Sequence, residues 1–391
     1  MVLVTHLLHK FNEAFGSGTI PARVFFAPGR LCLIGEHIDY NGGLVLPAAI
    51  SLGIYAVARV NNQKRITFIS DSQPGIITLN PEEEIVFTPE YGWGNYPAGV
   101  LKKMQEAGYN LGGADVFYLS TLPAGAGLSS SAALEVLTAF VFDNLFGNGQ
   151  TDRVRMALLC KEAENDFVGV RCGLMDQFAV AMGKANHALL LNCSSLEYAY
   201  VPAHLNDYVM LIFNTNKERR LAESVFNIRV QECGTAFQQI SRHRPVACLA
   251  DAAFKDAEQW IPESDVQKRA LHVIAENQRV QQAATALRNG DILRFGELLL
   301  QSHASLRNLY EVTGPELDAL VDAAKSQPEC IGAKMSGAGF GGCAFALVKK
   351  EKADLFKMRV LEAYRRMTGF SATCYMAELV DGVRKIEPAV K

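Results

Sequence analysis

Three short segments hold most of the residue types in this chain that could do chemistry. The first, Ala27–Gly43 (APGRLCLIGEHIDYNGG), contains Arg30, Glu36, His37 and Asp39 beside apolar residues. Carboxylates accept several hydroxyl hydrogen bonds, so the segment predicts a polar pocket suited to a sugar. A surface turn is one alternative. A metal site is another, although no second cluster of His or Asp completes a coordination set.

The second segment, PAGAGLSSSAALEVL (Pro123–Leu137), has glycines and three serines before an apolar helical pattern. A helix N-terminus carries unpaired N–H groups and a partial positive charge, glycines let the backbone approach a ligand, and serine hydroxyls can bind phosphate oxygens or Mg²⁺. A glycine turn with serine N-capping is the alternative, and no Walker A sequence is present. The candidate nucleotide-binding residues here are Gly125, Gly127, Leu128, Ser129, Ser130 and Ser131.

The third segment is GAKMSGAGFGGC (Gly332–Cys343), in which Gly337, Gly339 and Gly342 satisfy G-x-G-x-x-G. A dinucleotide-binding loop should follow a strand and open a helix, but the strand-like CAFALV follows here. The loop therefore favours backbone approach to a ligand or to another domain, with a glycine-rich hairpin as an equal alternative.

The elements that must position these segments change in character along the chain. Short β-rich runs at 22–28, 53–60, 65–70 and 114–120 are followed by helical patterns at 134–145 and 151–167. Long helical patterns then fill 221–240 and 265–288, and shorter ones cover 291–306 and 314–326. Strands close the chain around a helix at 352–367. We predict an α+β protein with two domains, residues 1–204 and 205–391, divided at a composition shift near Tyr200–Tyr208.

Composition narrows the class of protein. The 391 residues are 49% hydrophobic and 20% charged with a net charge of −3, which disfavours a nucleic-acid partner. No apolar run reaches the roughly 20 residues that span a bilayer, and the opening residues predict an amphipathic helix. The nine scattered cysteines include no C-x-x-C pair, which favours a reducing cytoplasm. No exposed heptad seam is visible, so a monomer is expected.

The three segments, in this order and spacing, resemble the motifs of the galactokinase branch of the GHMP kinases, and the resemblance covers nearly the whole chain. The first segment is the most specific, and CGLMDQF (Cys172–Phe178) is a fourth match. The resemblance implies a ribosomal-protein-S5-like N-terminal domain, a ferredoxin-like C-terminal domain and a site between them. It also implies ATP- and Mg²⁺-dependent phosphorylation of D-galactose to α-D-galactose 1-phosphate.

The resemblance also implies roles for single residues. Asp176 matches the catalytic carboxylate and Arg30 its partner; without the family match, Asp176 would be taken for an N-cap or a salt-bridge partner of Arg30. Ser130 and Glu164 match the Mg²⁺ ligands, and an exposed helical glutamate is the alternative for Glu164. Trp93 and Tyr96, in WGNYPAGV, match residues beside the adenine, with ordinary core aromatics as the alternative. The implied sugar-binding residues are Glu36, His37, Asp39, Gly173, Asp176 and Phe226.

Three positions depart from the galactokinase pattern. Cys32 stands where the motif has Asn, Phe226 stands where the family usually has a Tyr contacting the sugar, and Ile38 stands where many members carry Thr. These departures leave a related sugar, such as N-acetylgalactosamine or galacturonate, as an alternative substrate. A non-catalytic sugar sensor is the alternative of another class, but the intact LSSSAA segment disfavours it.

Overall fold

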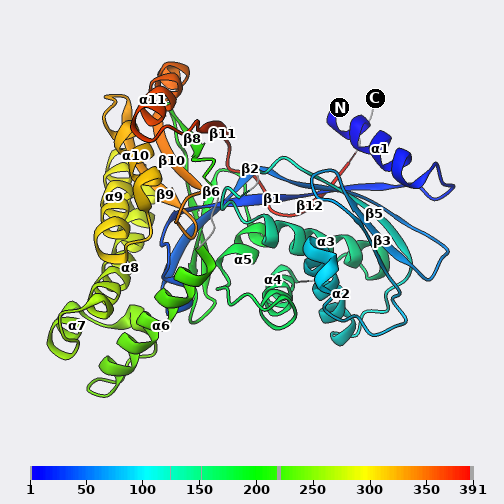
Figure 1. The fold of residues 1–391 in the computed structure, drawn as a ribbon, viewed down its shortest axis with the longest axis horizontal. Coiled ribbons are helices and arrows are strands. Elements are labelled where there is room, and N and C mark those ends of the chain that lie inside the picture. The colour runs from blue at the N-terminus through cyan, green and yellow to red at the C-terminus, as the bar shows by residue number, and fades with distance from the viewer. Residues whose placement is uncertain (1, 124, 151, 218–221, 388–391) are drawn as a thin grey trace.

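The computed structural model describes residues 2–123, 125–150, 152–217 and 222–387. Two β-sheets and their covering helices form two lobes, which confirms the α+β class (Figure 1). The strands at the start of the chain and the long helices of the second half lie where the sequence pattern predicts them; for example, α8 spans Asp265–Arg288.

The first sheet has the strand order β12-β1-β2-β5-β3-β4, with β6 paired to β2 and β7 to β6. Its pairs are antiparallel except for β3 with β5. The strands are β1 (Arg23–Ile34), β2 (Leu44–Val60), β3 (Ile66–Ser70), β4 (Ile76–Leu79), β5 (Ala114–Ser120), β6 (His187–Asn192), β7 (Tyr198–Pro202) and β12 (Arg384–Ile386).

Helices cover both faces of this sheet. The central one, α3, is apolar on nearly all sides and packs against β1 and β2, as expected for a buried helix. The amphipathic α1 packs Leu7 and Phe11 against β1, β2 and β5 in a separate cluster. The helices of this lobe are α1 (Val2–Phe15), α2 (Asn95–Glu106), α3 (Ser130–Phe146), α4 (Arg153–Glu162), a π-helix (Ala163–Val168), α5 (Met175–Met182) and 3₁₀ turns at Asp39–Asn41 and Pro89–Gly94.

The second sheet is antiparallel with the order β11-β8-β10-β9, and helices α8 to α11 form the outer layer of this lobe (Figure 1). Its strands are β8 (Tyr208–Asn214), β9 (Cys330–Ser336), β10 (Cys343–Lys349) and β11 (Thr373–Ala377). Its helices are α6 (Ala222–Ser241), α7 (Phe254–Trp260), α8, α9 (Ile292–Ser305), a π-helix (Leu306–Tyr310), α10 (Gly314–Lys325), α11 (Ala353–Thr368) and 3₁₀ turns at Leu249–Asp251 and Lys350–Lys352.

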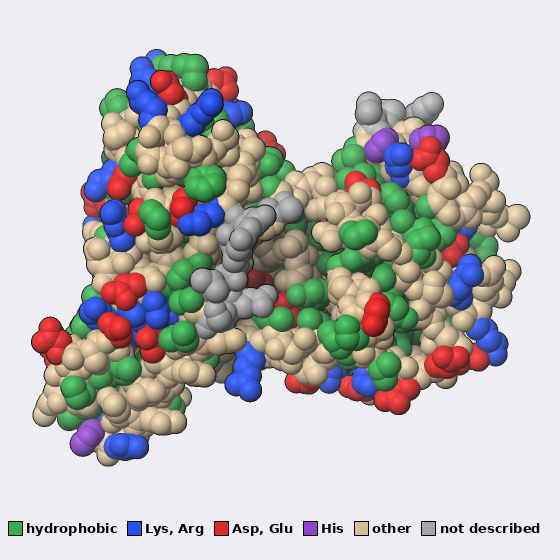
Figure 2. Space-filling view, in the orientation of Figure 1, with side chains coloured by type: hydrophobic (Ala, Val, Ile, Leu, Met, Phe, Trp, Pro, Cys, Tyr) green, Lys and Arg blue, Asp and Glu red, His purple; other side chains and the backbone are tan. Residues whose placement is uncertain are grey.

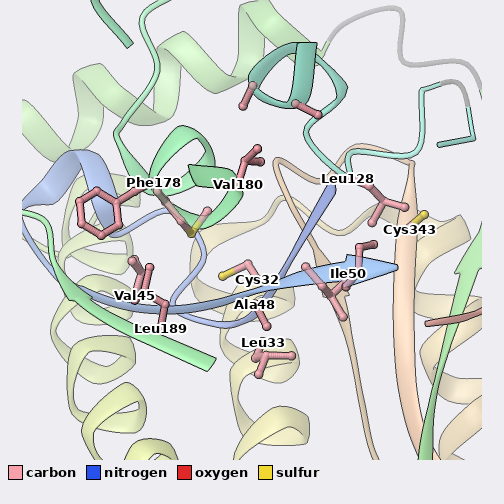
Figure 3. Close-up of a cluster of buried hydrophobic side chains, with 14 of the residues drawn as sticks. Cys32, Leu33, Val45, Ala48, Ile50, Leu128, Phe178, Val180, Leu189 and Cys343 are labelled. Atoms are coloured by element: carbon pink, nitrogen blue, oxygen red, sulfur yellow. The ribbon is translucent and has the colours of Figure 1, made fainter. Parts of the chain in front are cut away.

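The buried core runs from one lobe into the other. Figure 3 shows Cys32 and Leu128 of the first half in the same cluster as Cys343 of β10. The last strand, β12, also returns to pair with β1. The division of the chain into residues 1–204 and 205–391 stays a prediction. All nine cysteines are free, and no helix in the described ranges is long and apolar enough to span a membrane.

Candidate functional site

Arg30 and Asp176 form the centre of the candidate site. Arg30 lies on β1, is 4% exposed, and donates from Nε and Nη2 to the two carboxylate oxygens of Asp176 at 2.7 and 2.8 Å. Its Nη1 donates to the carbonyl of Gly127 at 2.8 Å. Asp176 sits in the first turn of α5, where Leu174 is the N-cap, so Asp176 does not cap the helix. A buried bidentate pair holds both side chains in one geometry.

The predicted phosphate loop precedes α3, which begins at Ser130. Gly125 and Gly127 have φ of 66° and 74°, in the left-handed region that glycine tolerates. Ser129 also has a positive φ, of 60°, and its hydroxyl donates to Asp176 instead of capping the helix. The serine-capping alternative is therefore wrong for Ser129. The loop therefore ends at a helix N-terminus, whose unpaired N–H groups suit an anion.

A pocket opens in front of Ser130 and Ser131. Trp93 and Tyr96 both line it, as expected for residues beside a base, and the Trp93 indole N–H donates to the carbonyl of Pro74 at 3.0 Å. Aromatic and aliphatic walls with a few hydroxyls are typical of a nucleobase pocket. The remaining lining residues are Ile54, Ser70, Ser72, Gln73, Tyr118, Ser120 and Leu134.

A second pocket lies between the lobes, where Figure 2 shows the surface hollowed. The Asp39 side chain packs directly against Gly173 in its wall: a Cβ built on Gly173 would lie 1.9 Å from Oδ2 of Asp39, so only glycine leaves room for this carboxylate. Burial and then the nearby Asp176 carboxylate raise the pKa of Asp39 to about 6. The pocket is lined by Arg30, Glu36, His37, Asp39, Tyr40, Cys172, Gly173, Met175, Asp176, Phe226, Gly337 and Ala338.

Glu36 and His37 reach this pocket but already have protein partners. Glu36, 1% exposed, forms an ion pair with the fully buried Lys334 of β9, and burial raises the pKa of Glu36. The His37 ring contacts the hydroxyl of Tyr40 through Nδ1 at 2.9 Å and the carbonyl of Ala338 through Nε2 at 3.1 Å. Burial lowers the pKa of His37 to about 3, so the ring is neutral.

Glu164 lies in the π-helix after α4 and is buried, so it is not the exposed helical glutamate of the alternative interpretation. Gln177 donates to Glu164 at 2.6 Å and to Glu135 at 3.1 Å, and the thiol of Cys172 donates to Glu164 at 3.3 Å. Burial raises the pKa of both glutamates. Within the described ranges no lysine or arginine forms an ion pair with either carboxylate, which leaves room for a cation from a ligand. The predicted partner, Ser130, is exposed at the start of α3.

The three departures from the family pattern differ in position. Cys32 is fully buried, and its side chain lies in the apolar cluster of Figure 3; Ser336 Oγ bonds the backbone of Cys32. Ile38 is fully buried too, and neither it nor Cys32 lines the sugar pocket. Phe226 does line it, 5.7 Å from the His37 ring between centroids. Of the three, only Phe226 can touch a bound sugar.

The two glycine loops meet at the site. A Cβ built on Gly337 would lie 2.8 Å from the carbonyl oxygen of Gly127, so glycine is needed for this approach. The third segment thus approaches the other half of the chain, and it is also the turn of the β9–β10 hairpin, so both of its interpretations are confirmed. Tyr40, Lys334 and Gln177 were not predicted from the sequence. Each is a polar residue inside one of the motif segments described above, and nothing else in the neighbouring sequence indicated a role in the site.

The comparisons agree with this geometry. The family model of the galactokinase galactose-binding signature matches residues 9–60, that of the GHMP kinase N-terminal domain matches 95–184, and that of the GHMP kinase C-terminal domain matches 283–366. A mevalonate kinase of Methanococcus jannaschii, 18% identical with a TM-score of 0.67, shares the fold.

Closer relatives cover the whole length. A galactokinase from Clostridium tetani is 45% identical over 386 residues, 98% of each chain, and one from Streptococcus thermophilus is 43% identical over 389 residues, 98% of this chain and 99% of its own. The crystal structure of Lactococcus lactis galactokinase complexed with galactose superposes with a TM-score of 0.94 at 38% identity, covering 99% of this chain and 100% of that one. With its fold, its paired glycine loops and this likeness along the full length, the chain belongs to the galactokinases of the GHMP kinase family.

Proposed function

We propose that this enzyme transfers the γ-phosphoryl group of ATP to the anomeric hydroxyl of D-galactose, giving α-D-galactose 1-phosphate and ADP. The observation that carries the proposal is the position of Asp176. Its carboxylate lines the pocket between the lobes and also accepts a hydrogen bond from Ser129 of the phosphate loop. A hydroxyl bound in that pocket and a phosphoryl group bound at the loop would meet beside this carboxylate.

The Arg30–Asp176 pair supports phosphoryl transfer. A sugar hydroxyl loses its proton as it attacks, and a carboxylate oxygen of Asp176 can accept it or orient the hydroxyl. Arg30 stays charged at any working pH and lies where negative charge collects on the phosphoryl oxygens. Arg30 donates two hydrogen bonds to Asp176 and Ser129 donates a third, so the carboxylate is oriented before the substrates bind.

The contacts with each substrate follow from the two pockets. We assign the sugar hydroxyls to Asp39, the backbone of Gly173, Glu36 and Asp176, with Phe226 as an apolar wall. A hydrogen-bond role for His37 stays a prediction, since both its ring nitrogens have protein partners. For the nucleotide we assign the base to Trp93 and Tyr96. The phosphates are assigned to the loop residues Gly125, Gly127, Leu128, Ser129, Ser130 and Ser131.

We assign Mg²⁺ to Ser130 and Glu164. The fit rests on two buried glutamates, Glu135 and Glu164, that form no ion pair among the described residues, and on the hydrogen bond of Glu164 with Ser131, the neighbour of Ser130. The described side chains form no cluster of three or more metal-binding groups, which suits an ion held largely by phosphate oxygens and water. When bound, Mg²⁺ would neutralise charge on the phosphates.

A coupled ATP-consumption assay with Mg²⁺ tests the function across galactose, 2-deoxygalactose, N-acetylgalactosamine, galacturonate, arabinose and glucose. We expect rapid turnover with galactose. Preference for another sugar would contradict the proposed substrate, and binding without turnover would indicate a sensor. Asp176→Asn should abolish turnover while both substrates still bind by calorimetry. We also infer a cytoplasmic monomer, from the free cysteines and the absence of a heptad seam, which fractionation and light scattering test.

A further inference from the structure

A chain of hydrogen bonds links the sugar pocket to the C-terminal lobe. It runs from Cys233 of α6 to Tyr310 (3.1 Å), from Tyr310 to Tyr40 (2.7 Å), from Tyr40 to Nδ1 of His37 (2.9 Å), and from Nε2 of His37 to the carbonyl of Ala338 (3.1 Å). Tyr310 is the last residue of the π-helix after α9, and Ala338 belongs to the glycine loop of the third segment (Gly332–Cys343). This series of hydrogen bonds therefore begins and ends in the second half of the polypeptide, and it passes through His37 and Tyr40 of the first segment (Ala27–Gly43).

The direction of every bond in this chain is determined. A carbonyl only accepts, so Nε2 of His37 must carry a proton, and in the neutral ring Nδ1 is then an acceptor. Tyr40 consequently donates to His37, Tyr310 donates to Tyr40, and the thiol of Cys233 donates to Tyr310. Each of the four groups, the Cys233 thiol, the two tyrosine hydroxyls and the His37 ring, thus donates one proton to the next. With a neutral ring, no other arrangement makes all four hydrogen bonds.

The surroundings keep the His37 ring in this state. His37 is 4% exposed and Tyr310 is fully buried, with their ring centroids 4.8 Å apart. His37 also has a φ of 63°, which is uncommon for a residue with a β-carbon and indicates a conformation that tertiary contacts enforce. Burial and the positive charge of neighbouring groups disfavour a second proton on the ring.

We propose that Tyr310 is a positioning residue for galactose: through Tyr40 it fixes His37 as the neutral Nε2–H tautomer, which ties the sugar segment to the glycine loop at Ala338. This inference rests on the proposed function for its effect on galactose. Without the donor from Tyr310, the Tyr40 hydroxyl is free to turn, and His37 loses its fixed acceptor bond. The wall of the sugar pocket then loosens, while the Arg30–Asp176 pair stays in place.

Steady-state kinetics of Tyr310→Phe and Tyr40→Phe test the effect on the sugar. Each variant removes a hydroxyl that makes two bonds of this network, and we expect the galactose KM to rise about tenfold, with the ATP KM and kcat changed by less than about threefold. The matched control is Tyr200→Phe, which removes a hydroxyl that donates to the carbonyl of Met182 at 2.7 Å, outside the site. A Tyr310→Phe enzyme with the galactose KM of this control, or one losing only kcat, would overturn the proposal.

The second measurement does not depend on turnover. Two-bond ¹H–¹⁵N spectra of ¹⁵N-histidine-labelled, ligand-free enzyme, assigned with His37→Gln, should show His37 as the Nε2–H tautomer. Tyr310→Phe should shift its Nδ1 resonance, and Tyr200→Phe should not. If His37 is an imidazolium or the Nδ1–H tautomer in the unsubstituted enzyme, the proposed hydrogen-bond directions are refuted, even if galactose is phosphorylated. Failure of galactose turnover with the expected tautomer would refute the proposed function instead, and with it the kinetic effect assigned to Tyr310.

Discussion

Asp39 is a partly buried carboxylate, and ionising it in the ligand-free protein costs free energy. Burial and the neighbouring Asp176 raise its pKa from 3.8 to about 6. By linkage, ionising it in the folded protein costs up to about 3 kcal/mol more than in the unfolded chain. The folded protein holds this proton more tightly, so the penalty is small below the unfolded pKa and grows as the pH rises through about 4 to 6. Asp39→Asn removes the penalty and should stabilise the ligand-free protein at neutral pH.

Urea unfolding of both proteins across this pH range checks the reasoning. From pH 4.5 to pH 7.5 the stability advantage of Asp39→Asn should grow by about 2 kcal/mol. Asp354→Asn, which removes a carboxylate from the exposed start of α11, controls for the loss of one negative charge. The same Asp39→Asn protein should bind galactose more weakly, because an amide accepts fewer hydroxyl bonds than a carboxylate.

A stability difference that does not change with pH would refute this account of Asp39. So would a difference of the opposite slope, with the unsubstituted protein gaining on the variant as the pH rises. Either result would mean that the carboxylate is ionised at little cost in the open pocket. Asp39 would then contribute to sugar binding only through its hydrogen bonds, and not because the sugar offsets the free-energy cost of ionising it.

Three further substitutions separate the parts of the site. Arg30→Lys loses the bidentate bond to Asp176 and should lower kcat by about 10²–10³, with binding of both substrates by calorimetry retained; unchanged kcat would contradict the role of Arg30. Glu164→Gln should raise the Mg²⁺ concentration for half-maximal rate about tenfold, and an unchanged Mg²⁺ titration would remove Glu164 from the metal site. Phe226→Tyr adds a hydroxyl to the sugar pocket and should lower the galactose KM about three- to tenfold, as measured against ATP KM in the same assay.

Much of the fold was predictable because its signals are local. The period-3.6 pattern of α8 and the β-rich runs of β3 and β5 can be found within a few residues of sequence. The partners of the site cannot. Tyr310 lies 270 positions from Tyr40 and carries no motif of its own, so only the packing of the two lobes shows their hydrogen bond.

The departures from the family pattern show the same limit. Cys32 and Phe226 looked equivalent as candidates for altered sugar choice, because sequence gives the residue type but not the direction of its side chain. Arg30 and Cys32 are two residues apart on β1 and so share a face of the strand, yet Arg30 reaches Asp176 whereas Cys32 is fully buried in the core. The three-dimensional position relative to the pocket, which Phe226 lines and Cys32 does not, decides which departure can matter.

The carboxylates of the site differ in whether a basic side chain of the protein forms an ion pair with them. Asp176 has Arg30, whose bidentate ion pair orients the carboxylate before any substrate arrives. Asp39 and Glu164 have no such ion pair among the described residues, and burial raises the pKa of each. Sugar hydroxyls and a metal ion are the groups that would offset this burial. For Asp39 this means that galactose binding near pH 6 should release protons. Calorimetry in buffers of different ionisation enthalpy measures that release, which Asp39→Asn should diminish for galactose and leave unchanged for ATP.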